Sequence, residues 1–500
     1  MQNNNTTNDT VEEIDESEVA RIRREKLDAL KADGKNPFAN VKYPRTNLST
    51  EILSDFEKFD GQAVAIAGRI VTRRIMGKAS FAHILDGAGK IQVYIKIDAV
   101  GEEKYDEWKK LDIGDIVGFS GSVFMTHKGE ISVAVSDFTL LSKSLLPLPE
   151  KFHGLKDNDL RYRQRYLDVI SNPEVKTAFM IRSKIITSIR RLLDSKNFLE
   201  VETPILNTIA GGANARPFIT HHNTLNLDMY MRIAPELYLK RLIVGGFDRV
   251  YELGRMFRNE GMDVKHNPEF TMLELYQAYA DYNDMMDLTE EIYLTVMKDL
   301  CLGPVIEYQG EKIDMSAPFK RMTMIEAVKQ YTGIDYNKLS REKMYKAAVE
   351  KGVEIADKNA SKGNILYAVF DTLVEEKLME PVFITEYPVE VSPLAKRVNG
   401  NPDFTYRFEF FIFAREMGNA YSELNDPVDQ RSRFEAQAAL KKKGDEEAQD
   451  TDDDYVTALE YGLPPTGGLG LGIDRMVMLF TDSSSIRDVI LFPTMKPIKK

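Results

Sequence analysis

The sequence contains almost no cysteine and no long apolar run. Cys301 is the one cysteine among 500 residues, which excludes an intramolecular disulfide and a thiolate zinc site. No apolar stretch approaches the ~18–20 residues of a membrane helix. Residues 1–16 are polar and acidic, where a secretory signal needs a basic and then an apolar segment. We therefore expect a soluble, cytoplasmic protein that does not act at a membrane.

The sequence also lacks an excess of positive charge. It has 66 Lys and Arg against 78 Asp and Glu, a formal net charge of −12. A general polyanion binder is excluded, because the field of the whole molecule would repel phosphate, and any nucleic-acid contact must come from local basic patches. With 43% hydrophobic residues a large core can form. At about 100–200 residues per domain, the length predicts more than one domain.

A helical extension is predicted for residues 1–60. Residues 1–10 are rich in Asn and Thr, as in a frayed tail. From Val11 to about Ala32 a helical pattern begins acidic and turns basic at Arg21, an order that suits the helix dipole. Stabilisation of a solvated helix and contact of its basic part with an RNA backbone explain this order equally well.

An OB-type barrel is predicted for residues 61–145, where the apolar period changes to two. A turn at residues 86–89 and a helical gap near residues 102–110 interrupt the pattern. The five strand candidates are Val64–Val71, Ser80–Leu85, Lys90–Ile95, Ile116–Phe124 and Ile131–Val135. Five short strands within about 80 residues are typical of a small closed barrel.

Basic residues and an aromatic residue gather on the first three strands of this barrel. They are Arg69, Arg73, Arg74, Lys78, Phe81 and Gln92. Cations for phosphates and a ring for a base suit single-stranded nucleic acid. The alternative is a solvated strand face with one core phenylalanine.

A proline-containing linker is predicted at residues 146–160, followed by a mixed α and β region over residues 161–500. A helix-rich insertion is expected at about residues 320–385. An amphipathic run from Met180 to Leu193 precedes a segment with a strand beginning near Pro204. The charged stretches at residues 441–447 and 450–454 are more consistent with solvation than with function.

A polar hairpin is predicted between Gly254 and Tyr276. With a period of two, Arg258 and Glu260 share one face, and Phe270, Met272, Glu274 and Tyr276 share a face of the returning strand. Such a face is too polar for a core wall, whereas Arg on a phosphate and Phe on a base could hold a nucleotide. Structural pairing of Arg258 with Glu260 is the alternative.

The glycine-rich segment Gly462–Met476 allows a close backbone approach, but its spacing is not that of a dinucleotide-binding fingerprint. Together with Pro204 and Phe257-Arg-Asn-Glu260, its part Gly470-Leu-Gly-Ile-Asp-Arg475 resembles the three signatures of class II aminoacyl-tRNA synthetases. The barrel resembles the anticodon-binding module of the aspartyl, asparaginyl and lysyl subgroup. Residues 232–246 and 419–426 are similar to the class II lysyl-tRNA synthetases within it.

This resemblance runs from about Val11 to Pro497 and implies an α+β fold. An N-terminal OB-type five-stranded β-barrel would precede a class II catalytic domain built on an antiparallel β-sheet flanked by helices. It also implies a homodimer formed around Pro204. The expected activity is ATP-dependent activation of L-lysine to lysyl-adenylate, followed by transfer to the terminal ribose of tRNA(Lys).

The chemistry of the residues tests which amino acid is activated. A lysine substrate needs carboxylates around an ammonium group, whereas aspartate would need Arg or Lys. Period two places Asn419, Tyr421 and Glu423 on one face, and Glu274 with Tyr276 adds a second acid and phenol. Acids and phenols together suit an ammonium group with a methylene stem.

The resemblance implies further roles for individual residues. Glu274, Tyr276 and Glu423 would contact the lysine side chain, while Gly212, Glu236 and Asn419 would hold its α-amino and carboxylate end. The ATP residues would be Arg258 (α-phosphate), Arg475 (γ-phosphate), Glu260 (adenine), Phe270 (adenine stacking) and His266 (outer phosphates). Glu409 and Glu416 would hold Mg2+ that bridges the ATP phosphates, and Arg74, Phe81, Gln92 and Glu130 would bind the anticodon.

Three points remain open from the sequence. Glu409 and Glu416 are separated by an odd number of positions, so they need a bend or bulge to share a face, and they could instead be exposed strand acids. Rival enzymes are an aspartyl- or asparaginyl-tRNA synthetase and a synthetase-like enzyme that lysylates a protein. A non-enzymatic rival is an OB-fold RNA-binding relative.

Overall fold

The computed structural model describes residues 9–149, 155, 157–209, 211–212, 215–442 and 451–498. Most of the expected N-terminal tail and of the charged stretch at 441–447 lies outside these residues, as does part of the expected linker. The chain divides into two compact units, Met1–Gly154 and Leu155–Lys500, which are described separately.

The first unit begins with helices. They are α1 (Asp9–Ala32), the short 3-10 turn η1 (Pro37–Ala39), α2 (Ser49–Ser54) and α3 (Phe56–Phe59). Arg23 of α1 is buried, and its guanidinium donates to the main-chain oxygens of Ile113, Ser144 and Leu146 at 3.1, 3.2 and 2.8 Å. Lys26 pairs with Asp112 at 2.7 Å. These two basic residues of α1 therefore anchor the helix.

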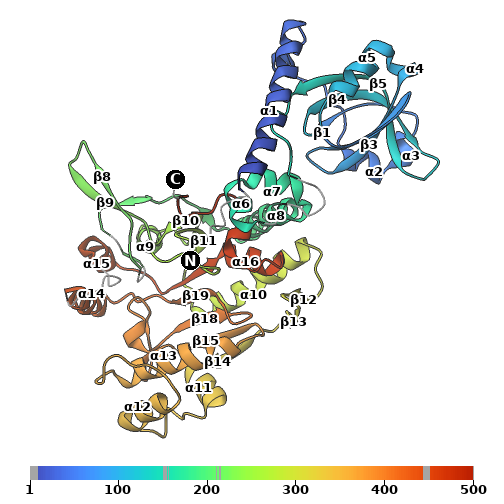
Figure 1. Ribbon diagram of the computed structural model, residues 1–500. Coiled ribbons are helices and arrows are strands. Elements are labelled where there is room, and N and C mark those ends of the chain that lie inside the picture. Colours follow the sequence, from blue (N-terminus) through green and yellow to red (C-terminus); the bar gives the residue numbers. More distant parts are fainter. Residues whose placement is uncertain are drawn as a thin grey trace, which may run out of the picture. The chain divides into compact units, whose positions relative to one another are not determined.

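A closed five-stranded barrel completes the first unit, as the sequence predicted (Figure 1). The neighbours follow the order β1-β2-β3-β5-β4. Its elements are β1 (Ala63–Met76), β2 (Ala79–Leu85), β3 (Lys90–Lys96), α4 (Ile97–Val100), α5 (Glu102–Lys110), β4 (Ile116–Met125) and β5 (Ile131–Ser142). Trp108 of α5 is fully buried and packs edge-on against Phe119 and Phe138, so α5 closes the apolar interior of the barrel.

The basic patch of the barrel is smaller than the sequence suggested. Arg69 donates to the main-chain oxygen of Gly114 at 2.7 Å, and Arg73 donates to that of Trp108 at 2.8 Å. Both guanidinium groups therefore hold the barrel together. Arg74 is exposed, beside Phe81 on the neighbouring strand.

An eight-stranded sheet forms the centre of the second unit (Figure 1). Its order is β14-β15-β18-β19-β20-β11-β10-β6. The strands are β6 (Leu199–Glu200), β10 (Arg249–Phe257), β11 (Glu269–Ala278), β14 (Lys320–Thr323), β15 (Val382–Thr385), β18 (Arg407–Phe411), β19 (Glu416–Ser422) and β20 (Thr466–Gly472). The pairs between β15 and β10 are antiparallel, but β14 pairs with β15 and β6 with β10 in parallel. The expected antiparallel sheet is thus mixed at both edges. A long connection joins the strands of each parallel pair, over residues 201–248 between β6 and β10 and over residues 324–381 between β14 and β15.

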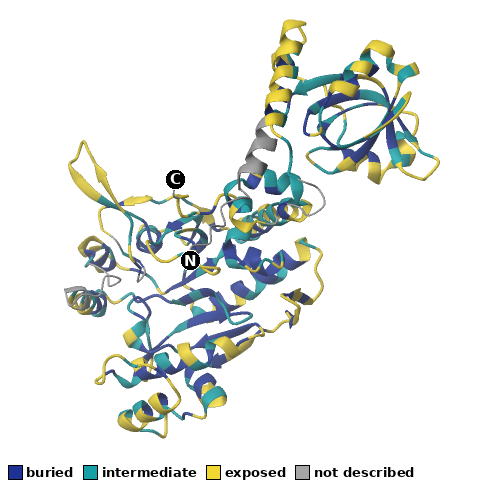
Figure 2. Ribbon diagram, viewed as in Figure 1, coloured by how far each residue is buried: buried dark blue, intermediate teal, exposed yellow. Residues whose placement is uncertain are grey.

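Helices pack on this sheet through one large apolar core. The helices α8 (Pro173–Ser195), α10 (Tyr282–Asp299) and α16 (Ile473–Phe480) contribute to it. The amphipathic run predicted in the sequence lies in α8, which buries Ile185, Ile189 and Leu193. Figure 2 shows the buried residues concentrated along the central strands and the helix faces that cover them.

The remaining elements surround this core. They are α6 (Asn158–Arg163), α7 (Arg165–Ser171), β7 (Leu206–Asn207), β8 (Ile219–His222), β9 (Leu227–Met231), α9 (Glu236–Val244), β12 (Val305–Tyr308), β13 (Glu311–Asp314), α11 (Met324–Thr332), α12 (Arg341–Glu350), α13 (Lys362–Leu373), η2 (Glu375–Lys377), η3 (Val389–Val391), β16 (Arg397–Val398), β17 (Asn401–Thr405), α14 (Pro427–Lys442), α15 (Asp453–Glu460) and α17 (Ile486–Val489). The helices α11, α12 and α13 fall within the expected insertion, whose ends are sheet strands β14 and β15. The short β6 ends at Glu200, so Pro204 lies beyond it and outside a strand.

Candidate active site

A cavity opens over β11, β19 and β20. Strand β10 ends at Phe257, so Arg258 and Glu260 lie in the loop after it, and the prediction that they share a strand face is wrong. The loop turns back where the Arg258 amide donates to the Pro268 oxygen at 2.9 Å. The predicted ATP residues that line this cavity are Arg258, Glu260, His266, Phe270, Glu416 and Arg475. The tertiary fold therefore brings the predicted nucleotide residues together by a different local structure.

The guanidinium of Arg258 lies against the ring of Phe270, with its carbon 5.1 Å from the ring centroid. The Nε of Arg258 is buried and has no hydrogen-bond partner among the described residues. A buried donor without a partner is costly, so a ligand that accepts this hydrogen bond would be stabilised here. Phosphate oxygens are such acceptors.

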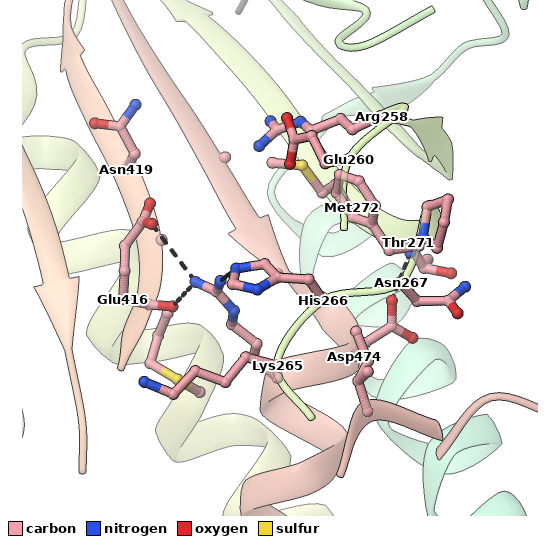
Figure 3. Close-up of a pocket in the computed structure, with 18 of the residues that line it drawn as sticks. Arg258, Glu260, Lys265, His266, Asn267, Thr271, Met272, Glu416, Asn419 and Asp474 are labelled. Atoms are coloured by element: carbon pink, nitrogen blue, oxygen red, sulfur yellow. Dashed lines mark hydrogen bonds and ion pairs between the residues drawn. The ribbon is translucent and has the colours of Figure 1, made fainter. Parts of the chain in front are cut away.

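Arg475 reaches the opposite side of the cavity from the first turn of α16. Its Nη1 donates to the Glu416 main-chain oxygen at 2.5 Å and lies 3.5 Å from Oε2 of Glu416, while its Nη2 lies 3.5 Å from Nε2 of His266. In Figure 3, the dashed lines that start at Glu416 mark the contacts of its main-chain oxygen and its carboxylate with Nη1 of Arg475. Two cationic or polar groups therefore face the cavity next to a carboxylate.

Asp474 holds this arrangement and was missed from the sequence. Its Oδ2 accepts from the Thr271 amide at 2.6 Å, and its Oδ1 accepts from Arg182 at 2.5 Å. It thus ties the start of α16 to β11 and α8. The sequence offered one indication of Asp474, because it directly precedes Arg475 in the glycine-rich segment.

A second cavity adjoins the first and shares Arg258, Glu416 and Asn419 with it. Six of the predicted lysine-binding residues line it, namely Gly212, Glu236, Glu274, Tyr276, Asn419 and Tyr421. Glu423, the seventh, follows the end of β19, and the described lining of the cavity does not include it. Their roles in binding stay predictions.

The acids of this cavity are buried beside phenols. Tyr421 donates to Oε1 of Glu236 at 2.7 Å, and Tyr276 donates to Oε2 of Glu274 at 3.2 Å. Burial, with the charge of Glu236 beside it, raises the pKa of Glu274 to about 8. An ammonium group placed here would favour the ionised carboxylate and reverse this shift.

Lys240 of α9 was also missed by the sequence reasoning. Its Nζ lies 2.6 Å from Oε1 of Glu236 and 2.5 Å from Oε2 of Glu423, and its side chain is fully buried. The signal in the sequence was its spacing, because Lys240 stands one helical turn after Glu236.

Glu409 and Glu416 lie on the neighbouring strands β18 and β19. A register shift between Phe410 and Phe411 supplies the bulge that their odd spacing required. Both carboxylates line the second cavity. The Glu409 carboxylate accepts from Tyr387 at 2.8 Å and pairs with Arg407 at 2.7 Å. Burial raises the pKa of Glu409 to about 7; Arg407 opposes this shift and Glu416 adds to it.

This pair of acids fits a magnesium ion that also binds a substrate. Carboxylate oxygens are ligands that Mg2+ prefers, and a cation would relieve the raised pKa of Glu409. Among the described residues, no group of three or more His, Cys, Asp or Glu side chains is placed to hold a metal. A Mg2+ ion bound by Glu409 and Glu416 would therefore need phosphate oxygens or water for its other ligands.

The barrel brings the predicted anticodon residues onto neighbouring strands. Phe81 stacks on Tyr94 with the ring centroids 4.8 Å apart. Gln92 donates to Oε2 of Glu130 at 2.8 Å, and His83 Nε2 lies 2.8 Å from Oε1 of the same carboxylate. The four residues named from the sequence are therefore close, with Gln92 buried and Arg74 and Glu130 exposed. Their contact with RNA stays a prediction.

The His221 side chain lies in the β8–β9 hairpin and pairs with Asp228 at 2.7 Å. Within the part of the chain that the structure describes, no helix is both long and apolar enough to span a bilayer.

Comparisons with known proteins match both units. Residues 157–496 match a family model described as tRNA synthetases class II (D, K and N), and residues 64–141 match an OB-fold nucleic acid binding domain. The lysine–tRNA ligase of Thermoanaerobacter pseudethanolicus is 57% identical over 99% of both chains. The lysine–tRNA ligase of Pelotomaculum thermopropionicum is 57% identical over 97% of this chain and 96% of its own, and that of Clostridium novyi 56% identical over 96% and 95%.

Proposed function

The chain belongs to the class II tRNA synthetases of the D, K and N group, and from this premise we propose how its residues activate lysine and attach it to tRNA. The activity is that of a lysine–tRNA ligase. The observation that carries the proposal is the buried group of Glu236, Glu274 and Glu423 with its phenols, next to a cavity that presents Arg258 and Arg475. A pocket for aspartate would need cations where these acids lie.

Lysine binds at the acidic end. Glu274, Tyr276 and Glu423 recognise the side-chain ammonium group and its stem, and Gly212, Glu236, Asn419 and Tyr421 hold the α-amino and carboxylate end. An apolar amino acid would leave these buried carboxylates without a partner, and such a site rejects the analogue strongly. The side-chain ammonium group is therefore the feature by which the site distinguishes lysine from an apolar amino acid.

ATP binds at the other end of the connected cavities. Arg258 takes the α-phosphate, Arg475 the γ-phosphate, and His266 the outer phosphates, while Phe270 stacks on adenine and Glu260 meets its edge. The buried unpaired Nε of Arg258 and its contact with Phe270 support this placement. Glu409 and Glu416 would hold Mg2+, which neutralises phosphate charge when bound.

The reaction needs alignment more than a side-chain nucleophile. The lysine carboxylate oxygen attacks the α-phosphorus, and the bond to the leaving pyrophosphate breaks, which gives lysyl-adenylate. The terminal ribose hydroxyl of tRNA then attacks the lysyl carbonyl, and AMP leaves. The developing charge on the α-phosphoryl oxygens is met by Arg258, so the site works by positioning and electrostatic stabilisation.

The barrel serves recognition of tRNA(Lys). We propose that Phe81 stacks on an anticodon base, that Arg74 meets the backbone, and that Gln92 and Glu130 contact base edges. We also propose a homodimer formed through the segment around Pro204. The cytoplasmic location stays a prediction.

The test is ATP–pyrophosphate exchange with each of the twenty amino acids and Mg2+. Exchange with lysine alone supports the pocket and the adenylation chemistry together. Exchange with aspartate or asparagine would keep the family and overturn the lysine pocket. If active, magnesium-replete protein exchanged with none of them, the OB-fold RNA-binding relative would be the better interpretation.

A further inference from the structure

A lysine of the chain itself lies at the acidic end of the substrate cavity. The Lys240 side chain has no exposed surface. Moving an ammonium group out of water costs several kcal/mol unless it is well paired. Its neighbours on the same helix, Leu237 and Leu239, are apolar. A charged residue in this position therefore requires a reason beyond packing.

Charged and aromatic groups surround Nζ of Lys240 from four elements. The carboxylates that pair with it are Glu236 on α9 and Glu423 after β19. The ring centroids of Tyr421 (β19) and Tyr455 (α15) lie 5.6 Å from Nζ, and that of Tyr276 (β11) lies 5.9 Å away. Glu274 (β11) adds a further charge nearby. Burial alone would lower the pKa of Lys240. The charges of Glu236 and Glu423 raise the pKa by more than burial lowers it, so the ammonium group stays charged.

The contacts of Lys240 with Glu236 and Glu423 are short ion pairs between fully or almost fully buried side chains. Glu423 fits because Gly468 has no side chain, since a Cβ there would lie 2.0 Å from Oε1 of Glu423. Glu423 is thus held behind the cavity wall, with Lys240 as its charged neighbour.

The charge of the pocket gives the reason for Lys240. Three buried carboxylates, those of Glu236, Glu274 and Glu423, face one ammonium group, so two net negative charges remain when all are ionised. Lysine brings two ammonium groups. Burial raises the pKa of Glu274 and of Glu423 to about 8, and the charge of Lys240 lowers both values. Without Lys240 the acids would hold their protons to still higher pH, and a protonated carboxyl attracts an ammonium group less.

We infer that Lys240 is a positioning residue for lysine recognition, which fixes the carboxylates of Glu236 and Glu423 and leaves the pocket two negative charges for the two ammonium groups of the substrate. This inference rests on the proposed lysine pocket. Lys240 touches Glu236 and Glu423, and through them it acts on the substrate. It therefore adds a residue on α9, backed by Tyr455 of α15, to those that set specificity.

The first test replaces Lys240 by Met, which keeps the length of the side chain and removes its charge. In ATP–pyrophosphate exchange, Lys240→Met should raise the KM for lysine at least tenfold and leave the KM for ATP within twofold. The pH profile of kcat/KM for lysine should move to higher pH, because Glu423 and Glu274 lose the neighbouring cation that lowers their pKa values. An unchanged KM with an unchanged profile overturns the inference. A lower KM does so too, because Lys240 would then compete with the substrate.

A matched control comes from the barrel. Lys143 is equally buried and also lies between two carboxylates, 2.5 Å from Asp112 and 2.9 Å from Asp115. Lys143→Met removes the same charge from a similar environment and should leave the KM for lysine within twofold. An equal rise in both variants would show a general loss of stability and would overturn the specific role.

A double-mutant cycle separates positioning from a purely structural effect. If Lys240 acts through Glu423, the increase in KM for Lys240→Met should be much smaller in a Glu423→Gln background, because coupled residues are non-additive. Multiplicative effects would overturn the inference.

A second variant applies if Lys240→Met does not fold. Tyr455→Leu removes the ring that lies against Lys240 without changing the described lining of the cavity. It should raise the KM for lysine by about three- to tenfold with ATP unaffected, and no rise would overturn the inference. If the unmodified chain showed no lysine-dependent exchange, the proposed function itself would be refuted. If the unmodified chain exchanged normally and the variants kept its KM for lysine, only the role of Lys240 would be refuted.

Discussion

Tyr421 and Glu236 join β19 to α9 by a hydrogen bond of 2.7 Å from the phenol to Oε1. The same oxygen is 2.6 Å from Nζ of Lys240. Oε2 of Glu236 has no such contact among the described residues, and this carboxylate lines the cavity. Oε1 is therefore fixed by the protein, and we propose that Oε2 accepts from the substrate amine.

Tyr421→Phe should weaken lysine binding. It removes a hydrogen bond that orients Glu236, worth about 1 kcal/mol, so the KM for lysine should rise about fivefold in the exchange assay. Tyr293→Phe is the matched control, because the buried Tyr293 hydroxyl has no hydrogen-bond partner among the described residues. Equal effects of the two substitutions would contradict the role of Tyr421.

The KM for lysine should fall as the pH rises from 6 toward 8. Burial and Glu236 raise the pKa of Glu274 to about 8, so this carboxyl is protonated below that pH in the free protein. An ammonium group favours the ionised form, and lysine binding then releases a proton. One proton changes the KM by up to about tenfold per pH unit. Glu274→Gln should raise the KM and reduce the pH dependence, and the remainder should come from Glu423, whose pKa burial also raises to about 8. A flat profile in the unmodified chain would contradict the assignment.

The same group should make the free protein more stable as the pH falls. Its folded pKa of about 8 exceeds the ordinary value of 4.5, so between these values the folded state binds a proton that the unfolded state lacks. Thermal unfolding without lysine should show this stabilisation from Glu274 on acidification through pH 8 to 5. In Glu274→Gln this contribution should be absent, and an identical pH dependence in both proteins would exclude it.

Arg258→Ala should reduce the kcat of exchange by about 10²- to 10³-fold, the loss typical for one donor to a developing charge. The KM for lysine should change much less, because the proposed partner of Arg258 is the α-phosphate of ATP. The control is Arg255→Ala on β10, just before the loop that carries Arg258; Arg255 lies 3.7 Å from Glu269. A loss confined to the KM for ATP, with kcat intact, would mean that Arg258 binds ATP without stabilising the transition state.

Phe81→Ala should impair aminoacylation of tRNA and spare lysine-dependent exchange. Loss of a stacking ring costs about 1–3 kcal/mol per base, or about fivefold to over a hundredfold in affinity for tRNA. Phe38→Ala, which removes a half-exposed phenyl from η1, is the control. A matched fall in both reactions would count against the barrel as the anticodon reader.

The sequence by itself determined the barrel and the family. Alternation over residues 61–145 fixes which side chains face inward, so five strands and a closed barrel followed from local pattern. The signatures around Arg258 and Arg475 identified the synthetase class, and the similarity of residues 232–246 and 419–426 identified its lysyl member. These features depend on residue type and short spacing, which a sequence states directly.

Only the tertiary structure decided how these residues meet. The end of β10 at Phe257, the bulge between Phe410 and Phe411, and the parallel edge strands depend on hydrogen bonds between distant segments. The pairing of Lys240 with Glu423 joins positions that are 183 residues apart in the chain. Periodicity reports the face on which a side chain lies, but its partner is set by packing across the sheet, and that packing makes a buried lysine part of a pocket for lysine.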